Sequence, residues 1–380
     1  MTNKKLFFTD LSKELIVITT VTNWKEPPRI RHEVAFQLSR FFNVLFVQLY
    51  CQRGMRRSSY KHSENILVLR LGMCFPGMTR LLMMFPMLMK FYNLIIIKIL
   101  SLEIKKYSIS KPMLLNFQFN APELHDPNIF NKSFYFCNED FINQNLSAST
   151  NQKYIIAKMQ AQVISLSDAV FTVSEPLREK LFSYGAKNVQ VIHSAHSFDL
   201  DYSRVNINRI RGKKISVCYM GFLNQYVNID WLKEAAEQDD ISLTIVGPVA
   251  YDWLLDKFRS LPNFKHIKVL TGLYLQDELL NHNVLLMPYA SPVDNEVTSV
   301  PAKLYQYLAV GRPVVSSVMP NLKVFPLKSV YQAETKIDFL NLIRQAAKED
   351  NDELRIMRIQ LTKNETWDAR GDQIYDTLTK

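Results

Sequence analysis

The chain has 380 residues, of which 47% are hydrophobic and 22% charged. This length and composition fit a globular protein of two domains and exclude a disordered chain. The formal net charge of +10 lies entirely in the first half, since residues 1–205 hold 25 Lys and Arg against 15 Asp and Glu, whereas residues 206–380 hold 21 of each.

The basic first half predicts an anionic partner: a membrane surface, a lipid-linked diphosphate or a nucleic acid.

The expected cellular compartment follows from two other features of the sequence. No signal peptide is expected, because Asp10 interrupts the short apolar run that follows Lys4 and Lys5. The cysteines lack metal-binding or redox spacing, so free thiols in a reducing compartment are expected at Cys51, Cys74, Cys137 and Cys218.

The first elements form a strand–helix–strand unit. Two buried strands and the helix between them are expected over Glu14–Thr20, Ile30–Arg40 and Val44–Tyr50. This order predicts a parallel, doubly wound sheet. The loop after the first strand carries Trp24, and Arg29 and His32 follow it, at the edge where such sheets bind ligands. A solvated loop is the alternative.

A basic cluster comes next, formed by Arg53, Arg56, Arg57 and Lys61. A nucleic-acid-binding module would interleave several aromatic residues with such charges, but only Tyr60 is present. We therefore expect no nucleic acid partner.

The segment 73–106 has the most unusual composition in the chain. Residues 78–102 are almost entirely Met, Leu, Ile and Phe, yet the longest uncharged run, Leu81–Met89, is far shorter than the ~20 residues that span a bilayer. Four basic residues fall within about 80° of one another on a helical wheel, which is most meaningful after Pro86: Arg80, Lys90, Lys98 and Lys105. The pattern favours a helix lying in the membrane interface with its lysines at the headgroups. A core helix packed on the sheet is the alternative, and both hold if the helix flanks an acceptor site.

Two carboxylates stand at the end of a predicted strand. Strands are expected over Met113–Phe119 and Ser133–Cys137, and Glu139 and Asp140 follow the second. Doubly wound folds place their chemistry at the carboxyl ends of strands. Neighbouring side chains of an extended strand point oppositely, so one of these acids should face the ligand. Two surface acids without a role are the alternative.

The remaining elements continue the alternation of helix and strand. A polar linker over 197–213 separates the first pattern from a second, which begins with a strand over Ile215–Met220 followed by Gly221 and Phe222. A later strand, Val284–Met287, leads to Tyr289. Helices are expected over 151–166, 175–183, 230–238, 251–258, 336–348 and 353–363, and a last one from Trp367. The sequence therefore predicts two doubly wound α/β domains.

The stretch from Ser299 to Ser317 has the clearest start and stop signals for a helix. Ser299 is suited to cap the helix and Pro301 to its first turn, while Gly311 and Pro313 end it before a short strand. Lys303 adds a cation in the first turn, where it opposes the helix dipole unless an anion lies there as well. A phosphate site is expected here, with an ordinary helix–strand unit as the alternative.

The run Lys-Leu-Tyr-Gln-Tyr-Leu-Ala-Val-Gly-Arg-Pro-Val-Val over residues 303–315 resembles the donor-site segment of glycosyltransferases with the GT-B fold. It is most similar to bacterial polysaccharide enzymes, including the membrane-associated glucuronosyltransferase of xanthan synthesis and teichuronic-acid-type enzymes. The resemblance covers most of residues 133–380 and is weaker before them. It implies two Rossmann-like domains facing a central cleft: an acceptor-binding, membrane-associated domain over 1–200, a donor-binding domain over 201–365, and a helix over 366–380 that crosses back to the first.

The resemblance also implies an activity. A sugar would move from a nucleotide-sugar, expected to be UDP-linked, to a lipid-linked (polyprenyl diphosphate) saccharide in cell-surface polysaccharide synthesis, with inversion and without a metal or another cofactor. The protein would lie peripherally on the cytoplasmic face of the membrane. Donor contacts would be Gly221, Phe222, Tyr289, Ser299, Val300, Lys303 and Gln306, acceptor contacts Trp24, Arg29 and His32, and the general base Glu139 or Asp140.

The sequence departs from this family at two positions. Members often have Glu where this chain has Thr298 and Gln306, and a neutral Gln306 is expected to hydrogen-bond a ribose hydroxyl. A non-catalytic sugar-nucleotide- or lipid-binding protein of the same fold is therefore the alternative. Asp199-Leu-Asp201 spells the metal-binding pattern of A-type glycosyltransferases, but its place in a polar interdomain stretch argues against a metal site.

Overall fold

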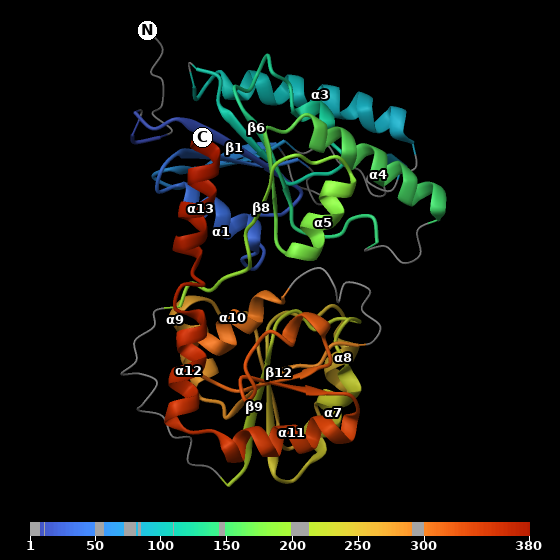
Figure 1. The fold of residues 1–380 in the computed structure, drawn as a ribbon, viewed down its shortest axis with the longest axis vertical. Coiled ribbons are helices and arrows are strands. Elements are labelled where there is room, and N and C mark those ends of the chain that lie inside the picture. Colours follow the sequence, from blue (N-terminus) through green and yellow to red (C-terminus); the bar gives the residue numbers. More distant parts are fainter. Residues whose placement is uncertain are drawn as a thin grey trace. The chain divides into compact units, whose positions relative to one another are not determined.

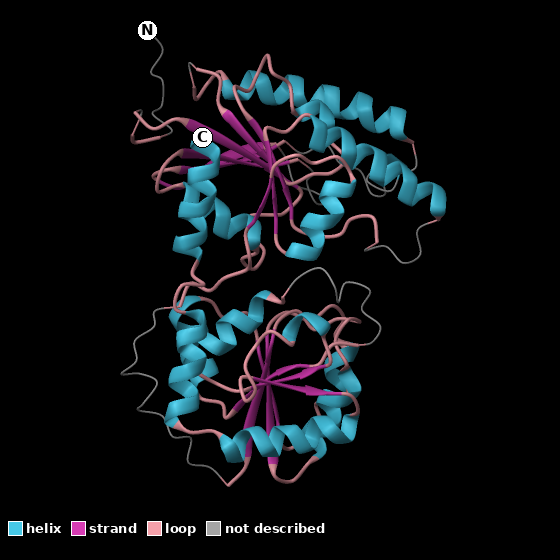
Figure 2. Ribbon diagram, in the orientation of Figure 1, coloured by secondary structure: helices cyan, strands magenta, loops and turns pink. Residues whose placement is uncertain are grey.

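The structure is a computed structural model that describes residues 8–10, 12–49, 57–71, 81–82, 85–108, 110–143, 149–198, 213–290 and 300–380. The chain divides into two compact units (Figure 1). Unit 1 comprises Met1–His193 and Arg370–Lys380, and unit 2 comprises Ser194–Ala369, where domain limits at 200 and 365 were expected. Each unit is a sheet with helices packed against it, as Figure 2 shows.

Unit 1 is built on an eight-stranded sheet in the order β3-β4-β2-β1-β5-β6-β7-β8. Its strands are β1 (Leu15–Thr20), β2 (Asn43–Gln48), β3 (Ser58–Ser63), β4 (Ile66–Arg70), β5 (Met113–Asn116), β6 (Ser133–Cys137), β7 (Ala169–Thr172) and β8 (Val189–Val191). Neighbouring strands are parallel except for the edge pair β3 and β4. The predicted parallel, doubly wound sheet is confirmed, and its strand order reverses between β1 and β5.

The helices of unit 1 are α1 (Ile30–Leu38), α3 (Pro86–Ile104), α4 (Thr150–Ser165), α5 (Glu175–Ser183) and α13 (Trp367–Thr379), with a 3-10 turn η1 (Pro122–Leu124). One side of α3 packs on the sheet, where Met89, Ile96 and Leu100 join the core around Val17 and Leu45. α3 starts at Pro86, because proline is tolerated in the first turn and breaks a helix elsewhere. The helix expected from position 73 is therefore confirmed only from Pro86 onward.

The last helix, α13, packs on the rest of unit 1 beside α1. The rings of Tyr375 and Phe41 stack with their centroids 4.2 Å apart, and Arg40 pairs with Asp372 at 3.0 Å. Gly371 lies so close to α1 that a Cβ atom there would come within 2.6 Å of Gln37 Cβ. Residues from the two ends of the chain thus build one core.

Unit 2 is built on a parallel six-stranded sheet in the order β11-β10-β9-β12-β13-β14. Its strands are β9 (Ile215–Met220), β10 (Ile241–Val246), β11 (Phe264–Ile267), β12 (Val284–Met287), β13 (Val314–Ser317) and β14 (Val330–Ala333). The order runs outward from β9 in both directions, which is the arrangement of dinucleotide-binding Rossmann sheets.

Helices cover both faces of the unit 2 sheet. They are α7 (Ile229–Glu237), α8 (Trp253–Asp256), α9 (Gly272–Leu280), α10 (Ala302–Ala309), α11 (Lys336–Glu349) and α12 (Asp352–Thr362), with the 3-10 turn η3 (Pro320–Leu322). Val217 and Tyr219 of β9 face a core shared with α7, α8 and α11. Cys218 and Met220 face a second core shared with α9, α10 and α12. This alternation places successive residues of a strand on opposite faces.

Candidate functional site

The candidate site lies in unit 2, at the carboxyl edge of its sheet, where the strand order reverses between β9 and β12. Open parallel sheets bind ligands at this point, because the loops leaving the two strands diverge there. Gly221 follows β9, and Tyr289 follows β12 after Pro288. Lys303, in the first turn of α10, reaches the same edge.

The ammonium group of Lys303 is held by aromatic side chains. Its Nζ atom lies 4.4 Å from the ring centroid of Tyr219 and 5.2 Å from that of Tyr289, both within the range of cation–π attraction. Nζ also donates a hydrogen bond to Tyr219 Oη at 3.3 Å, and that hydroxyl donates to the backbone oxygen of Phe222 at 3.1 Å. Tyr219 therefore connects Lys303 to the turn after β9.

Burial lowers the pKa of Lys303 to about 7, from an ordinary value of 10.5. Aromatic rings offset only part of the lost hydration of an ammonium ion, so the protein alone stabilises the positive charge poorly. An anion placed here would stabilise it. The structure thus provides a half-buried cation that a bound anion would stabilise.

Two glycines close the floor of this site. Gly221 has φ +139°, and a Cβ atom there would come within 2.9 Å of Lys303 Nζ. Gly247, which follows β10, has φ +137°, and its Cβ atom would lie 2.3 Å from the backbone oxygen of Gly221. Both positions need glycine, for the backbone conformation and for the close approach. Glycine at 247 thus lets its turn pack on the backbone of Gly221, and glycine at 221 leaves room for the Lys303 ammonium group.

The hydroxyl group of Tyr307 holds the end of β9 in place through hydrogen bonds. It accepts a hydrogen bond from the backbone N–H of Met220 at 2.8 Å and donates to the backbone oxygen of Leu286 at 3.3 Å. Because these atoms belong to β9 and β12, the side chain ties the two strands together where their order reverses. Tyr219, Tyr307 and Gly247 are site residues that the sequence analysis did not identify.

The structure places the other expected donor contacts as follows. Val300 packs against the core around α10, Gln306 is half-buried on α10, and the side chain of Phe222 is exposed. The N-cap of α10 is Pro301, so the prediction that Ser299 caps the helix is wrong, and Ser299 and Thr298 lie outside the described residues. Tyr289 turns one ring face to Lys303, whereas its expected contact with a base stays a prediction.

The two acids after β6 have different surroundings. The Asp140 carboxylate is buried and accepts hydrogen bonds from Lys180 at 2.5 Å and Asn143 at 3.0 Å. Burial alone would raise the pKa of Asp140, but these two donors outweigh it and hold the pKa below its usual value. The Glu139 side chain is 36% exposed and lies 4.0 Å from Arg31, whose guanidinium also donates to Asn138. Glu139 is therefore the accessible acid.

Trp24 and His32, expected to contact an acceptor, are buried instead. Trp24 donates a hydrogen bond to His62 and packs on the rings of His32 and Phe46. His32 Nδ1 accepts from the backbone N–H of Arg29 and Nε2 donates to the Asn23 oxygen, which fits a neutral ring. Burial lowers the pKa of His32 to about 4 accordingly. Burial argues against direct contacts for these two, and Arg29 remains exposed.

The outer side of α3 combines apolar and basic residues. Five large apolar side chains are exposed there, namely Met87, Leu88, Phe91, Leu94 and Leu102. Lys90 and Lys98 are exposed on the same helix, Lys105 forms its C-cap, and Arg80 lies outside the described residues. A core contact and an apolar outer surface therefore coexist on α3. Within the described ranges, no helix combines the length and the apolar character needed to cross a membrane.

Other sequence features bear on the site only indirectly. Arg57 of the basic cluster pairs with Glu103 of α3, while Arg53 and Arg56 lie outside the described residues. Asp199 and Asp201 also lie outside them. Across the described part of the chain, no group of three or more His, Cys, Asp or Glu side chains is arranged to hold a metal ion. Cys137 and Cys218 are buried free thiols.

The chain is similar to one curated protein in sequence. No protein-family model matches it. TuaH of Bacillus subtilis, a proposed glycosyltransferase of teichuronic acid biosynthesis, is 23% identical over 241 residues. That match covers 59% of this chain and 59% of the length of TuaH.

Solved structures share the fold over nearly the whole chain. Anabaena HepE in complex with UDP and glucose is 11% identical, with a TM-score of 0.67 over 97% of this chain and all of its own. The UDP-forming trehalose-phosphate synthase of Burkholderia xenovorans, in complex with glucose-6-phosphate, is 7% identical, with a TM-score of 0.68 over 97% of this chain and 100% of its own. The chain therefore has the GT-B fold of glycosyltransferases, and the fold expected from residues 303–315 is confirmed.

Proposed function

We propose that the protein is a glycosyltransferase that takes a sugar from a UDP-sugar donor. The observation that carries this proposal is the half-buried Lys303 ammonium at the switch point of unit 2, beside the glycine turn at Gly221. A diphosphate is the ligand that such a site favours, because it supplies the missing negative charge and accepts hydrogen bonds from backbone N–H groups. The fold shared with UDP complexes supports the same donor, and the sequence similarity to TuaH supports a glycosyltransferase activity.

Each residue then has a chemical role. The acceptor hydroxyl attacks the anomeric carbon, a new C–O bond forms, and the bond from that carbon to the diphosphate breaks. The negative charge left on the diphosphate is stabilised by Lys303 and the first turn of α10. The acceptor proton passes to a carboxylate, for which accessible Glu139 is the candidate, while Asp140 positions the loop through Lys180. A single displacement of this kind inverts the anomeric configuration.

The acceptor we propose is a lipid-linked saccharide of cell-surface polysaccharide synthesis, with a polyprenyl diphosphate carrier. The positive charge of the first half and the apolar outer side of α3 support a peripheral position on the cytoplasmic face of the membrane. No metal or other cofactor is required in this scheme.

The proposal is tested by donor binding followed by transfer. UDP should raise the melting temperature of the protein more than ADP or GDP at the same concentration. A ligand stabilises the folded protein more, the more tightly it binds, and UDP is expected to bind most tightly. With a membrane extract as acceptor source, a radiolabelled UDP-sugar should give a lipid-extractable product. UDP binding without transfer or hydrolysis of any UDP-sugar would instead support a non-catalytic sugar-nucleotide-binding protein of this fold.

UDP affinity should fall as pH rises above 7. The protein alone lowers the pKa of Lys303 to about 7, and a bound diphosphate would raise it, so binding at higher pH must take up a proton. The expected decrease is at most about tenfold per pH unit, because one proton is involved. Calorimetry between pH 7 and 8.5 measures it. Lys303→Arg, which stays charged, should bind with little pH dependence, and a flat wild-type profile would contradict this linkage.

Activity should survive chelation. Lys303 and the N-terminus of α10, rather than a metal ion, are proposed to stabilise the negative charge of the diphosphate. An excess of EDTA of about tenfold over divalent ions should therefore leave the transfer rate within about twofold. Loss of activity that Mg²⁺ or Mn²⁺ restores would contradict this scheme and would make Asp199 and Asp201 candidate metal ligands.

Binding to lipid vesicles should require anionic lipid and weaken in high salt without vanishing. Each lysine near an anionic surface contributes about 1 kcal/mol, and the exposed apolar residues of α3 add to it. A Lys90, Lys98 and Lys105 to Glu triple variant should leave the vesicles while keeping UDP affinity. The matched control makes the same change to Glu at three exposed lysines of unit 2, and it should bind vesicles like the wild type. These lysines are Lys257, Lys323 and Lys363. If both variants bound the vesicles equally, or if salt and carbonate both failed to release the wild-type protein, peripheral membrane binding through α3 would be refuted.

A further inference from the structure

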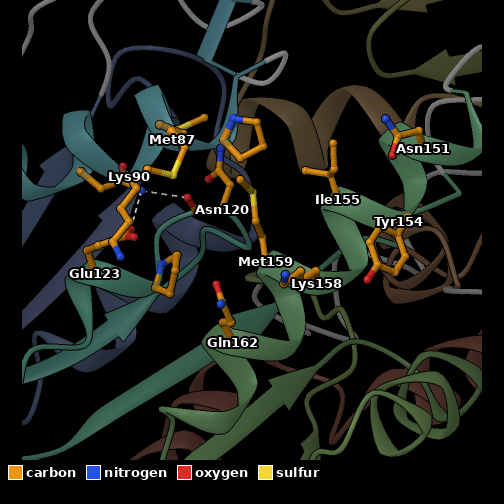
Figure 3. A pocket seen from close by; sticks show the side chains of 14 residues that line it. Met87, Lys90, Asn120, Glu123, Asn151, Tyr154, Ile155, Lys158, Met159 and Gln162 are labelled. Atoms are coloured by element: carbon orange, nitrogen blue, oxygen red, sulfur yellow. Dashed lines mark hydrogen bonds between the residues drawn. The ribbon is translucent and has the colours of Figure 1, made fainter.

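A pocket lies in unit 1 between α3 and α4, with the segment around η1 between the two helices. Its volume of about 340 Å³ falls at the low end of the ~300–1,000 Å³ of small-molecule sites. Figure 3 shows Met87 and Lys90 on the α3 side and Ile155, Lys158 and Met159 on the α4 side. No residue that we assign to sugar transfer lines it.

The interior of the pocket suits a flexible apolar chain. Met89, Ile155 and Met159 line it, and methionine side chains adapt their shape to a mobile partner. A buried polar group of the lining is the amide of Asn93, which donates to the backbone oxygen of Asn120 at 2.9 Å and to Glu123 at 2.8 Å. Because this amide already has partners inside the protein, it needs no hydrogen bond from a ligand, and the remaining polar residues of the lining include Asn151 and Gln162.

The mouth of the pocket is basic. Lys90 and Lys158 line it from opposite helices, and both are exposed. Glu123 is the single acidic residue of the lining, and its carboxylate accepts the hydrogen bond from Asn93. An anionic group would therefore be attracted to the two lysines, at the opening of an apolar interior.

The mouth also belongs to the apolar outer surface of the unit. Met87 and Tyr154 line the pocket and are 81% and 65% exposed. Phe91, one turn after Met87 on α3, is exposed as well. Exposed apolar and aromatic residues beside lysines are the composition of a surface that enters the interface of a bilayer. A lipid could leave such a bilayer for the pocket without crossing water.

We propose that this pocket binds one anionic membrane lipid, with a hydrocarbon chain among the methionines and its phosphate at Lys90 and Lys158. The inference rests on the peripheral membrane association proposed above and assigns it a specific site. A held lipid orients unit 1 on the membrane, which a diffuse charge interaction does not do.

The test uses vesicles of phosphatidylcholine with 30% phosphatidylglycerol, about a physiological anionic fraction, and sedimentation as the readout. Lys158→Glu should weaken vesicle binding about tenfold, since one attraction becomes a repulsion. Lys153→Glu makes the same charge change on the same helix away from the pocket and should weaken it less than about twofold. Ile155→Trp, which fills the pocket without changing charge, should also weaken binding.

A second measurement needs no bilayer. Monomeric decyl phosphate should bind the wild type by calorimetry, octyl glucoside and inorganic phosphate should not, and Ile155→Trp should abolish the binding. Equal effects of Lys158→Glu and Lys153→Glu, or wild-type decyl phosphate binding by Ile155→Trp, would overturn the pocket while membrane association stands. A wild type that ignores the vesicles overturns both. UDP affinity, measured on the same variants, tests the donor site separately.

Discussion

Lys303→Ala should lose about a hundredfold in transfer rate while the protein keeps its fold. Removing one preorganised group that stabilises charge in a transition state costs about 3 kcal/mol. Here the group is a half-buried ammonium that two tyrosine rings hold at the edge where β9 and β12 diverge. Its removal also relieves an unfavourable burial, so stability should not decrease on account of the charge.

Two controls sharpen this experiment. Lys323→Ala removes an exposed lysine from the same unit and should leave the rate within about twofold. Tyr219→Phe keeps the ring under Lys303 but removes the hydroxyl that links it to the Phe222 oxygen, so it should raise the KM for the donor more than it lowers kcat. Near wild-type turnover of Lys303→Ala, measured with saturating donor, would remove this residue from the diphosphate site.

Gly247→Ala should reduce the free energy of unfolding by about 3 kcal/mol and weaken UDP binding as well. The backbone at φ +137° is a region that other residues enter only at a cost of about 1–3 kcal/mol. The added Cβ atom would also meet the Gly221 oxygen at 2.3 Å, so the turn at Gly221, which lies beside Lys303, has to move. Urea unfolding and UDP calorimetry measure the two effects.

Gly272 provides the matched control. It lies in the same unit and also has a positive φ, of +57°, but a Cβ atom there would find no atom within 4 Å. Gly272→Ala should therefore cost only about 1–2 kcal/mol, the strain of a left-handed backbone, and leave UDP affinity unchanged. If Gly247→Ala and Gly272→Ala lost the same free energy of unfolding and bound UDP equally well, the close approach of Gly247 to Gly221 would not matter for UDP binding.

The sequence predicted the elements whose signal is local. Apolar runs such as Ile215–Met220 and Val284–Met287 mark buried parallel strands, and Gly311 with Pro313 marks the end of α10. Signals that depend on partners were missed. The hairpin of β3 and β4 has an exposed, polar first strand, Ser58–Ser63, which forms only because β4 pairs with β2 inside the sheet. A polar strand of this kind reads as a loop until its neighbour is known.

The site shows the same limit. Lys303 was identified because a cation in the first turn of a helix is unusual in itself. Tyr219 was not, because a tyrosine within an apolar strand has the pattern of a core residue, and only the folded chain brings its hydroxyl to Lys303 and Phe222. The sequence likewise left Glu139 and Asp140 equivalent. Lys180, 40 positions away from Asp140, distinguishes them by binding only one.

The packing of α13 on α1 has a consequence for how the protein is made. The ribosome delivers residues in order, so unit 2 has its entire sequence once residue 369 has emerged, while unit 1 still lacks residues 370–380. Until then, Phe41 and the close-packed surface at Gln37 have no cover from Tyr375 and Gly371. Domains usually finish folding in the order of their synthesis. In this chain the nascent first unit can be completed only after the whole of unit 2 has been translated, and until then its apolar surface at Phe41 stays uncovered.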